Sequence, residues 1–257
     1  MMDLGLRGLR ALVGGASSGL GAAVAAALAG EGAEVAVTAR RADLLKAVAS
    51  RIGAHPVVGD LSTLDGPAEV VQQATALLGG LDILIVNTGG PPAGIFTELD
   101  EERWSAAIDG SLRGPIRLLS AALPALGESD TASIVVVLAS TVRQPLPRLV
   151  TSNVLRPGLV GLVKSLAGEL APKVRVNGIA PGRIQTERAD WLDGVWAEQS
   201  GDSFEEVRQR ALAAIPLGRY GKPEEFARVA AFLASPAASY VSGQVLGVDG
   251  AMTRSIP

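Results

Sequence analysis

The chain has 257 residues and a net charge of −3, with 48% hydrophobic residues, 31 glycines and 15 prolines. This composition is typical of a folded α/β protein, and the acidic balance argues against a surface that binds nucleic acid. With no cysteine and one histidine, the chain is expected to have no disulfide, no thiol nucleophile and no transition-metal site. It shows no signal-peptide pattern and no apolar stretch of membrane-spanning length, so we expect a cytoplasmic protein without a membrane partner.

Short apolar runs alternate with helical patterns along the chain. The predicted strands are 9–13, 34–39, 55–58, 83–86, 133–138, 175–179 and 245–248. The predicted helices include 22–29, 44–51, 67–78, 101–122, 159–170 and 223–234. This alternation predicts right-handed βαβ units and a parallel sheet. We therefore expect an α/β fold, with one doubly wound domain over 1–257, seven mostly parallel strands and helices on both faces.

The segment 185–216 breaks this alternation. It contains Trp191, Trp196 and a predicted helix over 204–213, with Ser203 as its N-cap. A long excursion at the carboxyl end of a strand is typical of a substrate lid in an open α/β sheet. The alternative is that both tryptophans only anchor the excursion, or a subunit contact, by apolar packing.

A glycine-rich turn lies between the first predicted strand and the first predicted helix. It reads Gly14-Gly15-Ala16-Ser17-Ser18-Gly19-Leu20-Gly21. Glycine permits a sharp turn and a close approach to a ligand, and the positive end of the following helix suits a phosphate. The turn lacks the Lys-Ser or Lys-Thr pair of a P-loop. Taken alone, it fits either a phosphate-binding loop or an ordinary tight connection.

Two arginines follow the second predicted strand. An NAD site usually has an acidic residue about 20 positions beyond the glycines, where it binds the ribose 2′-hydroxyl. Here that place holds Arg40 and Arg41. The Arg40 guanidinium, with that of Arg41 as a second candidate, could donate charge-assisted hydrogen bonds to a 2′-phosphate, which favours NADP over NAD. The alternative is that both arginines form the solvated start of a helix.

Further motifs follow the later strands. They are Gly59-Asp60-Leu61, Asn87-Thr88-Gly89-Gly90, the run 177–186 (Asn-Gly-Ile-Ala-Pro-Gly-Arg-Ile-Gln-Thr), the run 215–225, and Val248-Asp249-Gly250. In this order, over nearly the whole chain, they resemble the short-chain dehydrogenase/reductase family, of the 3-oxoacyl-carrier-protein-reductase-like kind. The resemblance implies a Rossmann fold, NADP as the cofactor (with NAD possible) and a small-molecule substrate.

The resemblance also implies where the cofactor binds. The pyrophosphate would lie against the turn that contains Gly15, Ser17, Ser18, Gly19, Leu20 and Gly21. Asp60 and Leu61 would face the adenine, and Asn87 and Gly89 would lie along the cofactor. The nicotinamide end would be held by Pro181, Gly182, Ile184 and Thr186.

The catalytic positions depart from the family pattern. The family has a Ser at the end of the fifth strand, and Ser140 matches it. The hallmark Tyr-x-x-x-Lys aligns with Ser152 and Arg156, in a register fixed by the run 159–167. The Asn of the family's tetrad aligns with Ser111.

These replacements leave two main hypotheses open. A serine hydroxyl is a far weaker and shorter acid than a tyrosine, and Arg156 keeps a positive charge near the cofactor but cannot shuttle a proton. The first hypothesis is an NADP(H)-dependent oxidoreductase for a carbonyl or alcohol, in which Ser140 holds the oxygen and Ser152, Ser111 or a water supplies the proton. The second is a catalytically inactive dinucleotide-binding sensor or scaffold. A structural subunit in a mixed oligomer is a third.

Three further expectations concern the middle of the chain. A proline inside a helix removes an N–H donor, so we expect the helix around Pro157 to begin near Arg156 or to be kinked there. Arg143 and Arg148 either face the substrate pocket, where they could bind a carboxylate or phosphate, or lie in a solvated loop. By resemblance, helices 101–122 and 151–170 and the C-terminal strand would form the interfaces of a homotetramer.

Overall fold

The predicted strands form one parallel sheet in the computed structural model, which describes residues 3–255. The order is β3-β2-β1-β4-β5-β6-β7, and every neighbouring pair is parallel. The predicted α/β class and doubly wound sheet are confirmed. The strand bounds are β1 Arg10–Val13, β2 Glu34–Ala39, β3 His55–Val58, β4 Ile83–Val86, β5 Ser133–Val137, β6 Arg175–Pro181 and β7 Val245–Val248.

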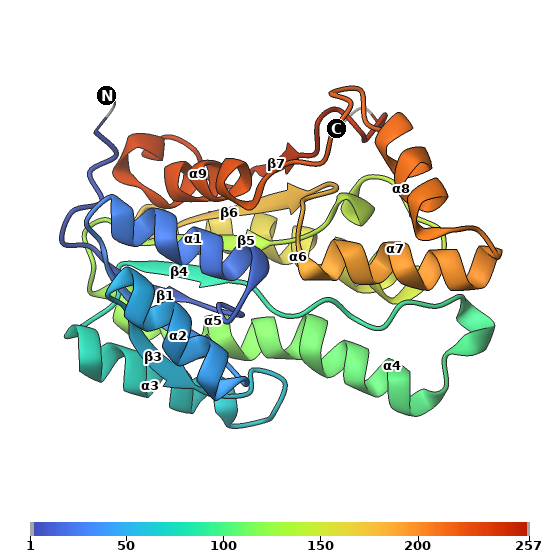
Figure 1. The fold of residues 1–257 in the computed structure, drawn as a ribbon. Helices are drawn as coiled ribbons and strands as arrows, with labels where there is room; N and C mark the ends of the chain where they lie inside the picture. The colour runs from blue at the N-terminus through green and yellow to red at the C-terminus, as the bar shows by residue number, and fades with distance from the viewer. Residues whose placement is uncertain (1–2, 256–257) are drawn as a thin grey trace.

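Helices cover both faces of the sheet (Figure 1). One face packs against α1, α2 and α9, and the other against α3, α5 and α6. The helices α4, α7 and α8 lie toward the carboxyl ends of the strands. The helix bounds are α1 Gly19–Gly30, α2 Ala42–Ile52, α3 Gly66–Leu78, α4 Glu101–Ile108, α5 Gly114–Gly127, α6 Val150–Glu169, α7 Glu187–Ser200, α8 Phe204–Ala213 and α9 Pro223–Ala234. None of the helices within residues 3–255 has the length and apolarity needed to cross a membrane.

The central strands are buried on both faces. In β4, Leu84 and Val86 pack on the side of α3, α5 and α6, whereas Ile83 and Ile85 pack on the side of α1 and α9. A strand in this position must be apolar throughout, which explains why continuous apolar runs predict these strands correctly. The predicted and observed bounds agree or differ by one or two residues at an end.

The strand order reverses direction at β1. The chain lays β2 and β3 on one side of β1 and then returns to place β4 on the other, with Val13 opposite Ile85. In open α/β sheets, ligands bind in the crevice outside the carboxyl ends at such a switch point. The glycine-rich turn follows β1 and Asn87 follows β4, so two of the predicted cofactor segments meet at this crevice.

The predicted helix 101–122 is interrupted. The structure has α4, then a π-helical segment over Asp109–Arg113, and then α5. A Cβ on Gly114 would lie 2.3 Å from the carbonyl oxygen of Leu61, so this glycine lets the helix pack directly on the backbone after β3. Short π-helical segments often mark functional sites, and this one contains Ser111.

The prediction that the helix around Pro157 begins near Arg156 is wrong, because α6 begins at Val150 and runs on as one helix through the proline. Hydrogen bonds to neighbouring loops hold its first turns. Thr151 Oγ1 donates to the Pro92 carbonyl at 2.8 Å, and the side chain of Asn153 exchanges two hydrogen bonds, at 2.9 and 3.1 Å, with the backbone of Leu146. These contacts offset the backbone hydrogen bond that Pro157 removes.

An ion pair joins the amino ends of β1 and β4. The Nε and Nη2 atoms of Arg10 each donate to the Asp82 carboxylate at 2.8 Å, as does the Arg10 backbone N–H. Burial alone would raise the pKa of Asp82, but the hydrogen bonds from Arg10 and Ser129 outweigh it and bring the pKa down to about 2. The carboxylate form therefore stabilises the folded chain at neutral pH.

We predict that Asp82→Asn lowers the free energy of unfolding by about 2 kcal/mol at pH 7. Because the folded-state pKa is depressed, this contribution is complete above about pH 4 and disappears as the pH falls toward 2. Urea unfolding of wild type and variant at matched protein concentration measures it. Asp65→Asn, at an exposed position, is the control. A difference between wild type and Asp82→Asn that stays constant from pH 7 to pH 2 contradicts the prediction.

Candidate active site

The glycine-rich turn packs closely on the end of β4. The Gly14 N–H donates to the Ile85 carbonyl at 3.0 Å, and Asn87 Nδ2 donates to the Gly14 carbonyl at 3.0 Å. Gly15 has a φ of +58°, and a Cβ there would lie 2.7 Å from Asn87 Nδ2. A Cβ on Gly21 would lie 2.4 Å from the Gly15 carbonyl oxygen. Only glycine fits at these positions, so the turn brings bare backbone to the crevice.

The start of α1 is suited to an anion. No side-chain hydrogen bond caps this end of α1, so its first N–H groups face the crevice with the positive end of the helix dipole. Thr88, next to Asn87, has a buried hydroxyl without a hydrogen-bond partner in the described part of the chain. A glycine cradle, an uncapped helix start and a partnerless hydroxyl together fit the phosphates and sugar of a dinucleotide.

Arg41, rather than Arg40, contacts the glycine-rich turn. Its Nη2 donates to Ser18 Oγ at 2.7 Å and to Ser17 Oγ at 3.1 Å. Arg40 is largely exposed and lies 3.9 Å from the Asp60 carboxylate. Burial would raise the pKa of Asp60, but hydrogen bonds from Ser62 lower it. The predicted Arg40 and Asp60 thus lie at the same edge of the sheet, with Arg41 closer to the turn.

The loop after β6 faces the glycine-rich turn from the other side. Thr186 caps α7 by accepting a hydrogen bond from the Ala189 N–H at 3.3 Å, and its Cγ2 lies 3.7 Å from where a Cβ on Gly19 would be. A Cβ on Gly182 would lie 2.5 Å from Asp249, which explains this glycine. Ile184 pairs with Gly221 in an isolated bridge. The predicted residues Pro181 to Thr186 and the turn therefore border one crevice.

The predicted catalytic residues lie where β5 and α6 meet. Ser140 opens a short 3₁₀ turn just beyond β5, and the hydroxyl of its neighbour Thr141 lies 2.9 Å from Ser152 Oγ on α6. Arg156, one turn further along α6, donates from Nη1 to the Val137 carbonyl at 2.8 Å. Ser111 is buried in the π-helical segment, which packs against α6.

Arg156 is a buried charge without an acidic partner among residues 3–255. The residue is 5% exposed, and its guanidinium forms no ion pair there. Burial lowers its pKa to about 10, and the positive charge of Arg188 contributes to the shift. A guanidinium is costly to bury unpaired, so this position favours an anion or hydroxyl-rich ligand beside it.

Arg188 connects the excursion 185–216 to the loop after β4. It lies in the first turn of α7, donates from Nη2 to the Pro91 carbonyl at 2.7 Å and stacks over Trp191 at 4.3 Å. Its Nε would lie 3.1 Å from a Cβ on Gly90. Burial lowers its pKa. The Arg188 side chain therefore spans the crevice close to Gly89 and Gly90.

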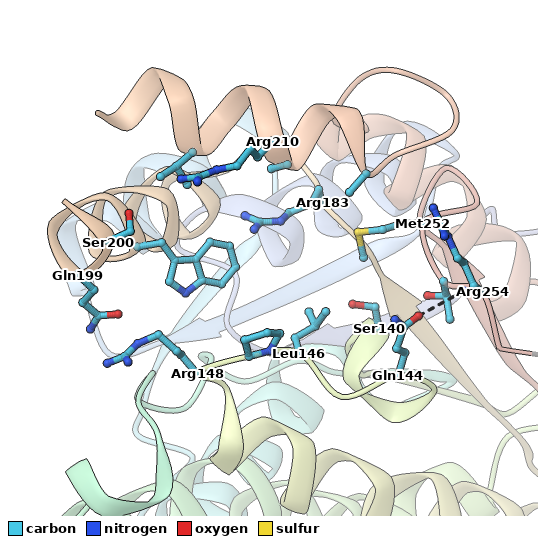
Figure 2. A pocket seen from close by; sticks show the side chains of 16 residues that line it. Ser140, Gln144, Leu146, Arg148, Arg183, Gln199, Ser200, Arg210, Met252 and Arg254 are labelled. Carbon is cyan, nitrogen blue, oxygen red and sulfur yellow. Dashed lines mark hydrogen bonds between the residues drawn. The ribbon is translucent and has the colours of Figure 1, made fainter. Parts of the chain in front are cut away.

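A cavity of about 810 Å³ opens beside Ser140 (Figure 2). The predicted excursion 185–216 supplies much of its wall through α7 and α8, and the predicted helix 204–213 and its Ser203 cap are found as expected. The lining residues are Ser140, Gln144, Leu146, Pro147, Arg148, Arg183, Trp196, Gln199, Ser200, Val207, Arg210, Ala211, Ala214, Met252, Thr253 and Arg254.

A buried network fastens α7 over this cavity. Asp193, fully buried on α7, accepts hydrogen bonds from Arg183 Nη1 at 2.6 Å and from the Tyr220 hydroxyl at 2.8 Å. Arg183 also stacks over Trp196 at 4.2 Å. Burial raises the pKa of Tyr220 to about 12, and the hydrogen bond to Asp193 acts in the same direction. The positive charge of Arg183 opposes this shift. The Tyr220 hydroxyl therefore keeps its proton at neutral pH and donates it in the hydrogen bond to Asp193.

Sequence reasoning missed four of these residues. Thr141, Asp193 and Arg188 belong to common residue types in unremarkable positions, and Arg183 lay unnoticed inside the run 177–186. Asp193 and Tyr220 are 27 residues apart, so no local pattern pairs them. The only signal was the tryptophan content of 185–216, which indicated an anchored excursion without naming its partners.

Comparison with known proteins agrees with this geometry. Residues 15–253 match the family model described as enoyl-(acyl carrier protein) reductase. The chain is 34% identical to 3-oxoacyl-(acyl-carrier-protein) reductase of Aquifex aeolicus, over 98% of this chain and all of that protein. It is also 34% identical to human dehydrogenase/reductase SDR family member 4, over 93% of this chain and 86% of that protein.

The chain belongs to the short-chain dehydrogenase/reductase family. Among solved structures of the family, L-sorbose reductase from Gluconobacter frateurii, complexed with NADPH and L-sorbose, has a TM-score of 0.93 and 29% identity, covering 99% of this chain and 100% of that one. This short-chain dehydrogenase/reductase chain therefore shares its whole architecture with an oxidoreductase.

We predict that Asp193→Ala loosens α7. Removal of the carboxylate leaves the Arg183 guanidinium without its partner, which lowers the free energy of local opening by roughly 2–3 kcal/mol. Hydrogen exchange by mass spectrometry should show faster exchange over 187–200. Asp190→Ala is the control. Asp190 also lies on α7, is more exposed than Asp193 and pairs with Arg208. Equal exchange in the two variants would show that the buried network does not fasten α7.

Proposed function

We propose that the protein is an NADPH-dependent reductase of a small carbonyl compound. In the reverse direction it would oxidise the corresponding alcohol with NADP. The observation that carries the proposal is the position of Ser140, which lies at the cavity wall while the dinucleotide-type crevice opens at the neighbouring strand ends. Bound NADPH supplies a hydride to the carbonyl carbon, and the carbonyl oxygen takes a proton. Membership of an oxidoreductase family supports the same chemistry.

The crevice has the groups that NADPH needs. The bare backbone of the glycine-rich turn and the uncapped start of α1 are suited to the pyrophosphate, and Arg156 and Thr88 are suited to sugar hydroxyls. Arg41, with Ser17 and Ser18, is suited to the 2′-phosphate, since a guanidinium and two hydroxyls converge there. The sorbose reductase to which the chain is similar is complexed with NADPH.

Ser140 is suited to hold the substrate oxygen. It lies at the end of β5, where its hydroxyl can donate to a carbonyl oxygen in the adjoining cavity. A donor aimed at developing negative charge typically contributes about 10²–10³ in rate. This is the one position of the family's tetrad at which the chain keeps the family residue.

The proton has to come from a hydroxyl or a water rather than a phenol. Ser152 and Thr141 share a hydrogen bond of 2.9 Å, and Thr141 adjoins Ser140. Both hydroxyls are buried behind Ser140 and do not line the cavity, so a water would have to enter beside Ser140 to deliver a proton to this pair. A serine relay lacks the lowered pKa of a phenol near an ammonium group, so we expect slow turnover.

Arg156 serves to position rather than to transfer protons. Its hydrogen bond to the Val137 carbonyl holds the guanidinium beneath the end of β5. A guanidinium stays protonated in proteins, so it can orient hydroxyls and stabilise negative charge but cannot shuttle a proton. The excursion 185–216 would act as the lid that excludes water from this centre, with Arg188 closing it toward Gly90.

An inactive dinucleotide-binding sensor or scaffold is the second candidate. The observation that favours it is that Ser152 and Arg156 are both occupied by internal partners, Thr141 and the Val137 carbonyl.

Homotetramer assembly also stays a prediction. Exposed Ile116 on α5 and Val154 on α6 support the proposed helical interface, and exposed Leu246 on β7 supports the second one.

We predict that the protein binds NADPH at least about tenfold more tightly than NADH, because a hydrogen bond to a charged group changes affinity by about that factor. Fluorescence titration of each cofactor measures this. Arg41→Met should remove most of the preference and leave NADH binding unchanged, whereas Arg40→Met, with its exposed guanidinium, should have a smaller effect. Equal affinity for both cofactors refutes the assignment of Arg41, and binding of neither refutes both candidate functions.

Chemistry separates the two candidate functions. Under single-turnover conditions with a panel of ketones and aldehydes, wild type should oxidise NADPH with at least one substrate, and Ser140→Ala should slow this about 10²–10³-fold. The double variant Ser152→Tyr with Arg156→Lys restores the family pair and should be faster than wild type. If wild type never oxidises bound NADPH while the double variant does, the sensor or scaffold is the correct assignment.

A further inference from the structure

The cavity beside Ser140 has an unbalanced lining. Of the residues that line it, Arg148, Arg183, Arg210 and Arg254 are basic, and none within the described chain is an aspartate or glutamate. The rest of the wall is mainly apolar, with Leu146, Pro147, Trp196, Val207 and Met252 among it. Such a cavity suits a molecule with an apolar body and a negatively charged end.

The acidic partners of these arginines lie outside the wall. Arg148 pairs with Glu98 at 2.6 Å, Arg183 with Asp193 at 2.6 Å, and Arg210 with Asp202. None of the three carboxylates lines the cavity. The three guanidinium groups therefore lie at the cavity wall, whereas the carboxylates that pair with them lie outside it. Within residues 3–255, the wall thus presents four guanidinium groups and no carboxylate, an arrangement that favours an anionic group in the cavity.

Arg183 is fixed before any ligand arrives. Asp193 is fully buried behind it, Trp196 stacks on it, and the Tyr220 ring lies 5.8 Å from its guanidinium carbon. A side chain held in this way loses little further entropy when it binds an anion. Arg183 also follows directly on Pro181 and Gly182, so its position is coupled to the loop that borders the cofactor crevice.

Arg148 is held in an unfavourable backbone conformation. Its φ is +58°, in the left-handed region, and its Nε is buried without a hydrogen-bond partner in the part of the chain described. The Gly94 N–H donates to its carbonyl at 2.7 Å, and Glu98 holds its Nη2. Strain of this kind persists where the surrounding structure enforces it, and it gathers at ligand-binding positions.

Arg148 and Arg210 lie in a different part of the cavity from Ser140, whereas Arg254 lies beside Ser140 and Gln144. Figure 2 shows Arg148, Gln199, Ser200 and Arg210 toward one side, and Ser140 and Gln144 toward the other, with Leu146 between Arg148 and Ser140. A substrate whose carbonyl oxygen contacts Ser140 would therefore extend along apolar wall toward Arg148 and Arg210.

We propose that the substrate is an oxo acid, in which a carboxylate several carbons from the carbonyl is held by Arg148, Arg183 and Arg210. This inference rests on the proposed carbonyl reduction for the role of Ser140. The carboxylate takes no part in the chemistry. It sets the position of the carbonyl and discriminates against neutral and cationic ketones.

Calorimetric binding of 7-oxooctanoate and its methyl ester tests this inference, with and without NADPH. The acid has a carbonyl and a carboxylate at opposite ends of a flexible chain, and its methyl ester removes the charge at one end. The acid should bind at least about tenfold more tightly than the ester, since a hydrogen bond to a charged group contributes about that factor. Added salt should weaken binding of the acid and leave the ester unaffected.

Two variants and one control locate the carboxylate. Arg148→Met and Arg210→Met should each lower the affinity for the acid and leave that for the ester unchanged, and Arg210, being the more exposed, is the substitution less able to disturb folding. Arg51→Met, on α2 and outside this cavity, makes the same change in net charge and should have no effect.

The outcomes separate this inference from the proposed function. Equal binding of acid and ester, or no binding of the acid, overturns the inference, whatever the cofactor titration shows. Selective binding of the acid that Arg148→Met and Arg210→Met both leave intact overturns it as well. Selective binding that these variants reduce supports it, and because binding is also measured without NADPH, this holds even if no carbonyl is reduced.

Discussion

The contact between the glycine-rich turn and Asn87 is the constraint on which the site depends. Because β1 and β4 are adjacent and parallel, the segments that follow them leave the sheet side by side. Asn87 Nδ2 binds the Gly14 carbonyl, and the positions of Gly15 and Gly21 leave no room for a Cβ. This packing aims the start of α1 at the crevice. A side chain at Gly15 would have to move the turn or Asn87, and the anion-binding backbone would move with it.

The parts of the fold that the sequence predicts are those dictated by local chemistry. Central strands are continuous apolar runs because both faces are covered, and α8 begins after Ser203 because that hydroxyl caps it. The interruption at Ser111 escaped prediction, and the argument from Pro157 placed the start of α6 too late, because distant contacts decide both. Gly114 packs on the Leu61 backbone, and Thr151 and Asn153 bond to loops that precede them in the chain. Propensity cannot anticipate partners that only the folded chain supplies.

The candidate site likewise has residues that the sequence predicts and residues that only the folded structure shows. The glycine turn, Asn87, Ser140 and Thr186 follow strands, and parallel strands deliver their carboxyl ends to one edge, so the sequence alone brings these residues together. The hydrogen-bond network of Asp193, Arg183 and Tyr220 could not be found in that way. Asp193 is one carboxylate among several in 185–216, and only its burial beside Arg183 and Tyr220 distinguishes it. Arg41 and Arg40 are neighbours of the same type, and geometry alone shows which one reaches Ser17 and Ser18.

Buried positive charge links the cofactor crevice to the substrate cavity. Arg156 has no acidic partner among residues 3–255, and Arg188 has none there either. The positive charge of Arg188 adds to burial in lowering the pKa of Arg156. In contrast, Arg183 is balanced by a carboxylate that the fold buries behind it. A buried guanidinium that is paired with a carboxylate destabilises the folded chain little. A buried guanidinium without such a partner is stabilised the most when it binds an anionic ligand. Arg156 lies at the end of β5 and Arg188 at the loop after β4, whereas Arg183 lines the cavity beside Ser140. On this basis, an anionic group that contacts Arg156 or Arg188 should stabilise the folded chain more than one that contacts Arg183.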